Sequence, residues 1–156
     1  MKLGIIGLGR MGGNMRTRLR QGGHEAVGYD PNQQVSDFPS LEAMVAALPS
    51  PKVVWSMVPS GAITDKTIDE LAGVLTRGDI VIDGGNSYFR DSIRHGEVLS
   101  AKGIHFLDIG TSGGVWGLEE GYCLMAGGPR EAFDHVEPIL ATLAPKDGYA
   151  YVGPSG

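Results

Sequence analysis

Residues 2–12, KLGIIGLGRMG, place a G-x-G-x-x-G motif directly after a short apolar run. The motif leads into a helical pattern in which Met11, Met15 and Leu19 share one face. A carboxylate, Asp30, ends the next expected strand, near the interval of about twenty residues that is typical of dinucleotide-binding units. A strand, a glycine turn, a helix and an acid in this order predict the first βαβ unit of a dinucleotide-binding fold.

Each glycine of the motif has its own physical reason. Gly7 allows a tight turn out of the strand, Gly9 lets the backbone approach a pyrophosphate, and Gly12 allows the helix to pack closely on the strand. The helix N-terminus offers free N–H groups and a partial positive charge to bound phosphates. The expected cofactor loop therefore comprises Gly7, Leu8, Gly9, Arg10, Met11 and Gly12. The alternative is a glycine-rich turn that holds no ligand.

Composition describes an ordinary globular protein and excludes several functional classes. The chain has 156 residues, 42% of them hydrophobic and 20% charged, which suits one domain with a proper core. A net charge of −5 without a basic cluster predicts no nucleic-acid partner. No apolar run is long enough to span a membrane, and no signal-peptide layout is present. The single Cys123 and the absence of metal-ligand spacing predict a cytoplasmic protein without a metal site.

Strand and helix patterns alternate along the whole chain. We expect strands near residues 2–6, 25–29, 52–58, 79–83, 104–109, 121–126 and 148–152. Helical patterns cover 62–75, 86–102 and 130–144, with Pro138 expected to kink or restart the last one. This alternation predicts an α/β fold over residues 1–156: a doubly wound, mostly parallel Rossmann-type sheet with helices on both faces. Ligands of such sheets bind beyond the carboxyl ends of the strands.

Asp30 indicates which dinucleotide the site prefers. Its carboxylate is placed to accept hydrogen bonds from the adenosine ribose, and it would repel the 2′-phosphate of NADP. The next residues, Pro31 and Asn32, supply no cation. NAD is therefore expected over NADP. The alternative is that Asp30 only forms a turn by bonding its own backbone, and the two roles are compatible.

Two further strand-end loops carry polar groups. Residues 83–87 read DGGNS, and Asn86 offers a donor and an acceptor that suit a carboxamide or a sugar hydroxyl. Asn-Ser is equally common as a helix N-cap. Residues 108–114 read DIGTSGG, and their hydroxyl and backbone N–H groups could hold a polar substrate or simply form a flexible turn. Asp83 and Asp108 are the only plausible titrating residues of the expected crevice.

With these loops the chain resembles 6-phosphogluconate dehydrogenase over its whole length, as that enzyme's amino-terminal cofactor domain. The resemblance rests on residues 6–12 (IGLGRMG), 83–87 (DGGNS), 112–114 (SGG) and 153–156 (GPSG). DGGNS is the specific element. The β-hydroxyacid dehydrogenases are similar at the first glycine loop and at SGG, but typically carry Ser-Thr in place of Gly-Asn-Ser.

The resemblance implies roles for individual residues. The Gly7–Gly12 loop would hold the pyrophosphate, Asn86 would lie between nicotinamide and substrate, and Val58 would line the cofactor groove. The remaining implied contacts are Tyr29, Asp30 and Pro59 on the cofactor, and Ser112, Gly113 and Gly114 on the sugar acid.

Departures from the widespread NADP-dependent enzymes favour the shorter, NAD-preferring branch. Tyr29-Asp30-Pro31 replaces Asn-Arg-Thr, and Val58-Pro59-Ser60 replaces Val-Lys-Ala, so two cations near the 2′ position are lost. Val115 stands where those enzymes carry an acid after SGG, which puts one substrate contact in doubt.

The implied reaction is oxidation and decarboxylation of 6-phosphogluconate to ribulose 5-phosphate and CO2, in the pentose phosphate pathway. Its catalytic lysine and glutamate are expected beyond Gly156, in a region leading to a helical carboxy-terminal domain that this sequence lacks. We therefore expect no catalytic residue here, little activity alone, and a homo-oligomeric parent enzyme. The alternatives are a β-hydroxyacid or semialdehyde dehydrogenase, and a non-catalytic NAD-binding module.

Overall fold

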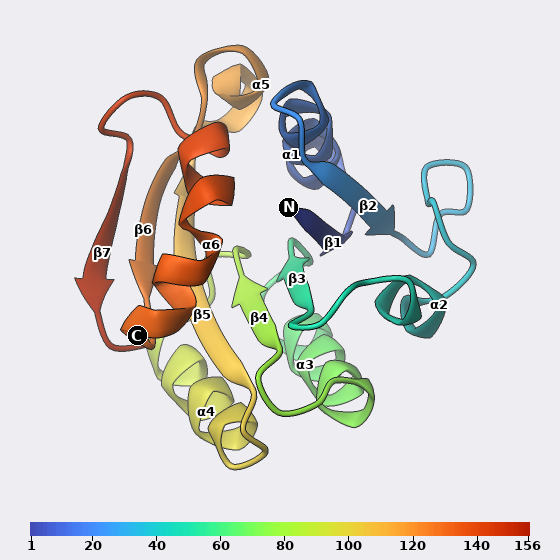
Figure 1. Ribbon diagram of the computed structural model, residues 1–156, viewed down its shortest axis with the longest axis vertical. Helices are drawn as coiled ribbons and strands as arrows, with labels where there is room; N and C mark the ends of the chain where they lie inside the picture. The colour runs from blue at the N-terminus through green and yellow to red at the C-terminus, as the bar shows by residue number, and fades with distance from the viewer.

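Seven strands form one sheet in the computed structural model, which describes residues 1–156 (Figure 1). The strands are β1 (Lys2–Ile6), β2 (Glu25–Tyr29), β3 (Val53–Ser56), β4 (Ile80–Asp83), β5 (His105–Ser112), β6 (Cys123–Gly127) and β7 (Tyr149–Gly153). Their order is β2-β1-β3-β4-β5-β6-β7. The first five strands are parallel, β6 is antiparallel to β5, and β7 is parallel to β6. The predicted mostly parallel sheet is therefore confirmed.

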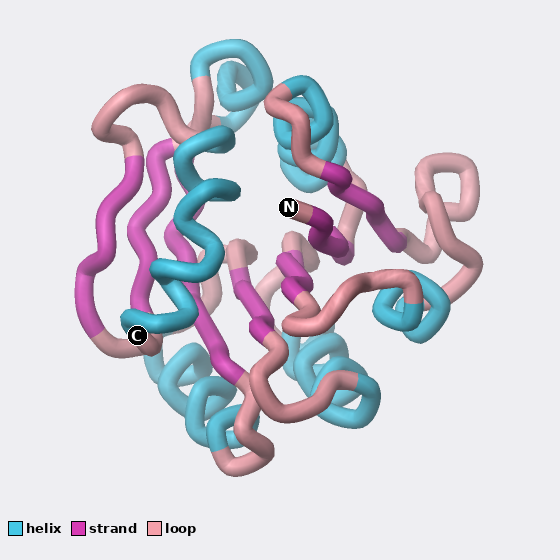
Figure 2. The backbone as a smooth tube through the Cα atoms, in the orientation of Figure 1, coloured by secondary structure: helices cyan, strands magenta, loops and turns pink.

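Helices cover both faces of this sheet (Figure 2). They are α1 (Arg10–Gln21), α2 (Leu41–Ala46), α3 (Ala62–Val74), α4 (Phe89–Ser100), the 3-10 turn η1 (Gly114–Trp116), α5 (Gly117–Glu120) and α6 (Arg130–Leu143). One core holds α1 and α6 against the sheet through residues such as Met15 and Leu140. A second core holds α2, α3 and α4 against the other face, with Met44, Leu71 and Leu99 at its centre. The doubly wound arrangement is confirmed.

Burial explains why the central strands are continuously apolar. Trp55 of β3 is fully buried in the first core, while its neighbour Val54 is fully buried in the second. A strand with helices on both faces needs apolar side chains in both directions. The last two strands differ, because Met125 of β6 and Val152 of the edge strand β7 are half to two-thirds exposed. None of the helices has the length and apolar character needed to cross a bilayer.

Strand β5 is longer than the sequence pattern predicts. It runs to Ser112 rather than ending at residue 109, because its last residues pair with antiparallel β6, in the register Thr111 to Leu124 and Ser112 to Cys123. Thr111 and Ser112 therefore belong to a strand and not to a flexible turn. Only Gly113 and the residues after it leave the sheet.

Helix α6 passes through Pro138 without interruption, so the expected restart is wrong. Proline in a helix interior costs one backbone hydrogen bond and a steric clash, about 3 kcal/mol. Burial of Phe133, Val136, Ile139 and Leu140 on the same helix offsets this cost. The short helices α2, η1 and α5 have no counterpart among the predicted elements, since three to six residues carry too little periodicity.

Candidate functional site

The candidate site lies where the chain switches direction across the sheet. β1 and β3 are neighbours, and the helices that follow them, α1 and α3, pack in different cores on opposite faces. A crevice forms at the carboxyl ends of such strands. Here it is a cavity of about 580 Å3. Its walls come from four loops and hold Gly7, Gly9, Arg10, Met11, Gly12, Asp30, Pro31, Met57, Val58, Pro59, Ile63, Gly84, Gly85 and Asn86.

The glycine loop has the geometry that its sequence predicts. Gly7 has a φ of +91°, and a Cβ there would lie 2.8 Å from the carbonyl oxygen of Met57. A Cβ on Gly12 would overlap the carbonyl oxygen of Gly7. Gly9 faces open space and begins α1 with no side chain to cap it. The tight turn and the close approach are thus observed, and the first N–H groups of α1 have no side-chain acceptor.

Asp30 holds the glycine loop in place. Its Oδ2 accepts a hydrogen bond from the backbone N–H of Leu8 at 2.8 Å, and its Oδ1 accepts one from the N–H of Asn32, also at 2.8 Å. The turn interpretation of Asp30 is therefore correct, and the same carboxylate lines the cavity. Each carboxylate oxygen has a second lone pair, so Asp30 retains acceptor capacity for a ribose hydroxyl.

Two of the predicted cofactor residues do not line the cavity. Leu8 is buried in the first core, and its side chain lies against Gly28, where a Cβ would come within 2.6 Å of it. Tyr29 packs beside the second core. Leu8 contributes its backbone N–H to Asp30 instead of a contact surface.

Asn86 connects the cofactor cavity to β5. Its Nδ2 donates to the carbonyl of Thr111 and its Oδ1 accepts from the N–H of the same residue, both at 3.2 Å. Its φ of 56° is the left-handed conformation that asparagine tolerates better than most residues. The N-cap alternative is wrong, because Tyr88 is the N-cap of α4 and makes no side-chain cap bond. Asn86 therefore fastens the end of β5 beside the cavity.

A smaller polar cavity of about 180 Å3 adjoins Asn86 on the other side. Its walls include Asp83, Ser87, Ser92 and Asp108. Asp83 accepts from the N–H of Gly85 at 2.9 Å and from the Ser87 hydroxyl at 2.6 Å. Asp108 accepts from the N–H of Gly156 at 2.9 Å. Two carboxylates from paired positions of β4 and β5 thus face one small space.

The predicted substrate residues are only partly brought together. Asn86 lies in the walls of both cavities, whereas Ser112, Gly113 and Gly114 line neither. They lie further along the chain from Asp108, at the end of β5 and the start of η1. Val115 and Trp116 follow with 55% and 65% of their surfaces exposed, so this part of the chain is an open edge.

Burial raises the pKa of Asp108, although the hydrogen bond from Gly156 opposes the shift. The protonated carboxyl therefore stabilises the fold below the unfolded-state pKa, and this contribution is lost as the pH rises through the folded-state pKa. Asp108→Asn keeps an oxygen acceptor for Gly156 and removes the charge. We expect the unfolding free energy of the variant to rise relative to that of the wild type as the pH increases from about 3 to 7. Urea unfolding at several pH values measures both free energies, and a variant that loses stability relative to the wild type as the pH rises would contradict the assignment.

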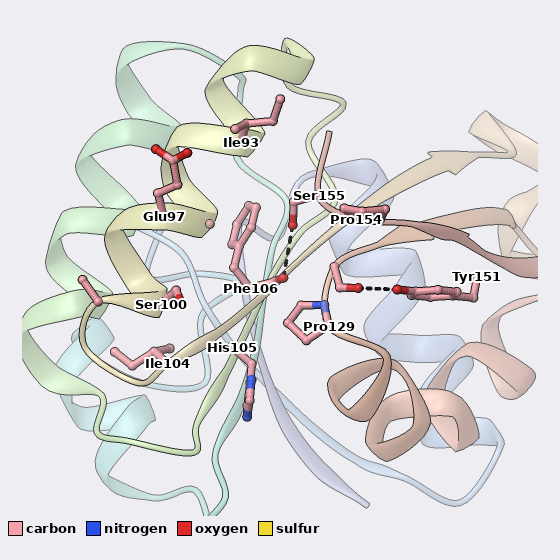
Figure 3. Close-up of a pocket in the computed structure, with 13 residues that line it drawn as sticks. Ile93, Glu97, Ser100, Ile104, His105, Phe106, Pro129, Tyr151, Pro154 and Ser155 are labelled. Atoms are coloured by element: carbon pink, nitrogen blue, oxygen red, sulfur yellow. Dashed lines mark hydrogen bonds between the residues drawn. The ribbon is translucent and has the colours of Figure 1, made fainter.

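The largest cavity lies away from the glycine loop (Figure 3). It measures about 670 Å3 and separates α4 from the turns after β6 and β7. Tyr151 closes one side by donating its hydroxyl to the carbonyl of Gly128 at 2.7 Å, and Ser155 donates to the carbonyl of Phe106 at 3.5 Å. Its walls include neither the glycine loop nor Asp30, so we assign the chemistry to the smaller cavity at the glycine loop.

Five residues of the cofactor cavity were not among the predicted contacts: Pro31, Met57, Ile63, Gly84 and Gly85. Ile63 is 53% exposed at the start of α3, two residues after Gly61, whose φ is +90°. An apolar residue next to such a turn is a usable signal. Gly84 is required because a Cβ there would overlap Nε1 of Trp55, which only the folded structure reveals.

Comparison with known proteins agrees with this geometry. A family model described as the NAD binding domain of 6-phosphogluconate dehydrogenase matches residues 2–153. A putative 6-phosphogluconate dehydrogenase of Bacillus subtilis, YqeC, is 39% identical over 165 residues, covering 100% of this chain and 55% of that protein. The NAD(+)-dependent, decarboxylating 6-phosphogluconate dehydrogenase of Haloferax volcanii is 40% identical over 166 residues, covering 100% of this chain and 54% of that protein. This chain thus spans about half the length of these relatives.

Solved structures show the same architecture. The 6-phosphogluconate dehydrogenase of Plasmodium falciparum superimposes with a TM-score of 0.93 at 26% identity, covering 99% of this chain and 37% of that chain. A 3-hydroxyisobutyrate dehydrogenase of Mycobacterium tuberculosis gives a TM-score of 0.88 at 24% identity, covering 99% of this chain and 55% of that chain. This likeness shows the shared fold alone. Because the family model matches residues 2–153, nearly the whole chain, the chain belongs to the family of NAD-binding domains of 6-phosphogluconate dehydrogenase.

Proposed function

We propose that this chain binds NAD as the cofactor-binding part of an enzyme that oxidises and decarboxylates 6-phosphogluconate. The observation that carries the proposal is the position of Asn86, in the wall shared by the glycine-loop cavity and the polar cavity of Asp83 and Asp108. A residue in that place can touch both a nicotinamide and a sugar acid. The specific DGGNS motif and the relatives' printed activities support the same assignment.

The cavity fits a dinucleotide because its glycines leave room where side chains would intrude. The N–H groups at the start of α1 would hold the pyrophosphate, Val58 and Pro59 would line the groove, and Asp30 would accept the ribose hydroxyls. Bound NAD would supply the hydride acceptor for the oxidation. The task of Asn86 would be to orient the nicotinamide, and Ser112, Gly113 and Gly114 would contact the sugar acid at the open edge of the crevice.

General acid–base catalysis contributes typically about 10²–10⁴-fold to a rate, and we assign no residue of this chain to that task. The relatives are roughly twice as long. We propose that residues 1–156 act as a dinucleotide-binding domain, and that catalysis requires a further, helical domain and a homo-oligomeric enzyme in the cytoplasm. The isolated chain would then produce little NADH from NAD and 6-phosphogluconate, and substantial turnover would refute this part of the proposal.

NAD is proposed over NADP because Asp30 follows β2 and residues 30–51 contain no lysine or arginine. Calorimetric titration of the purified chain is expected to give tighter binding of NAD+ than of NADP+. Asp30→Asn should lower the ratio of NAD+ affinity to NADP+ affinity by about tenfold, since it removes the repulsion between the Asp30 carboxylate and the 2′-phosphate of NADP+. Asp69→Asn, on the exposed side of α3, is the matched control and should leave the ratio unchanged. Tighter binding of NADP+ by the wild type would overturn the assignment of NAD.

A further inference from the structure

Arg10 is a cation in the wall of the cofactor cavity that folding does not explain. It is the first residue of α1, its side chain is exposed, and it lines the cavity together with Asp30 and Pro31. The partial positive charge of a helix N-terminus opposes a cation there. No acidic residue in the first turn of α1 offsets this charge.

The other arginines of α1 are all held by the protein. Arg16 and Arg20 both bond the carboxylate of Asp37, each at 3.0 Å. Arg18 donates to backbone carbonyls of Thr142 and Leu118. Arg10 alone among them forms neither a hydrogen bond nor an ion pair within the chain. Its guanidinium is therefore free to meet a ligand.

Arg10 and Asp30 are the two charged side chains in the lining of the cavity. The backbone N–H groups at the start of α1 suit a pyrophosphate, which leaves the guanidinium of Arg10 available for a further phosphate of the nucleotide. Asp30 already has both oxygens engaged by the N–H groups of Leu8 and Asn32, which fixes the carboxylate and keeps it from moving toward the guanidinium. A planar guanidinium is well matched to a phosphate group.

We propose that Arg10 is a specificity residue that binds a phosphate on the 2′ oxygen of the adenosine and so limits the discrimination against NADP. This inference rests on the proposed function, because it assumes a dinucleotide in the same cavity. Asp30 repels a 2′-phosphate and Arg10 attracts it. The ratio of affinities for NAD and NADP then reflects the difference between the two effects.

Two isomeric nucleotides test the inference. Adenosine 2′,5′-bisphosphate carries its second phosphate on the 2′ oxygen, while 5′-ADP carries it in the diphosphate. Arg10→Gln is expected to weaken binding of the 2′,5′ isomer by about tenfold and of 5′-ADP by less than about twofold. Arg90→Gln is the matched control, because Arg90 is also an exposed arginine in the first turn of a helix but lies outside the cavity.

Each outcome of these titrations has a defined meaning. Equal losses for both isomers would place Arg10 on the diphosphate and overturn the inference, as would no loss for either. Raised salt should weaken binding of the 2′,5′ isomer more in the wild type than in Arg10→Gln, because the guanidinium contact is screened. If the wild type binds 5′-ADP normally, a negative result refutes only the role of Arg10. If the wild type binds neither isomer, the cofactor site itself is refuted.

Discussion

Gly12→Ala is expected to abolish measurable dinucleotide binding and to lower the free energy of unfolding by about 3 kcal/mol. A Cβ at this position would overlap the carbonyl oxygen of Gly7, which is backbone and cannot rotate away. Either α1 must move off the sheet or the turn at Gly7 must open. Both movements displace the N–H groups that would hold the pyrophosphate. Thermal unfolding and NAD+ titration of the purified variant measure the two effects.

Gly13→Ala provides a matched control one residue further along the same helix. A Cβ on Gly13 would lie 3.5 Å from the carbonyl oxygen of Leu8, an ordinary contact. Alanine has a higher helix propensity than glycine, so this variant should gain up to about 1 kcal/mol and bind NAD+ as the wild type does. If the two variants behave alike, the close approach at Gly12 is not what shapes the loop.

The first βαβ unit could be predicted almost to the residue because its rules are local. β1 and β2 have the predicted bounds, and the conformations of Gly7 and Gly12 follow from the motif itself. The role of Asp30 was predictable in part. Its bond to Asn32 is a local turn, but its bond to Leu8 joins residues 22 apart in sequence and depends on the pairing of β1 with β2.

The substrate side of the crevice was harder to predict because long-range pairing shapes it. The antiparallel partner β6 draws Thr111 and Ser112 into the sheet, and only then can Asn86 bond the backbone of Thr111. Asp108, expected at a strand end, lies within β5 and is fastened to Gly156, 48 residues away. Sequence periodicity reports none of these contacts, since it describes one element at a time.

Arg18→Met is the second substitution for which we expect a large effect. Arg18 lies on the same helix as the glycine loop, and its guanidinium donates to the carbonyl of Thr142 near the end of α6 at 3.0 Å, and to Leu118 and Glu119 of α5 at 3.1 and 3.3 Å. Cations stabilise helix C-termini, and hydrogen bonds to charged groups contribute more than neutral ones. Methionine fills similar space but leaves these carbonyls unpaired, and the bonds it removes to Thr142 and Leu118 are partly buried. We expect a loss of about 3 kcal/mol in the free energy of unfolding.

The location of the damage distinguishes this role of Arg18 from a general loss of stability. Because α5 follows the Ser112–Gly114 segment, hydrogen exchange in Arg18→Met should accelerate first at residues 114–121 and at the end of α6, while β1 to β4 stay protected. Arg18→Lys keeps the charge but lacks the fork of donors, and should restore only part of the protection. Arg90→Met, which removes an exposed arginine without hydrogen bonds, should change stability by less than about 0.5 kcal/mol. Uniform acceleration across the sheet would show that Arg18 does not specifically join the cofactor helix to the substrate side of the crevice.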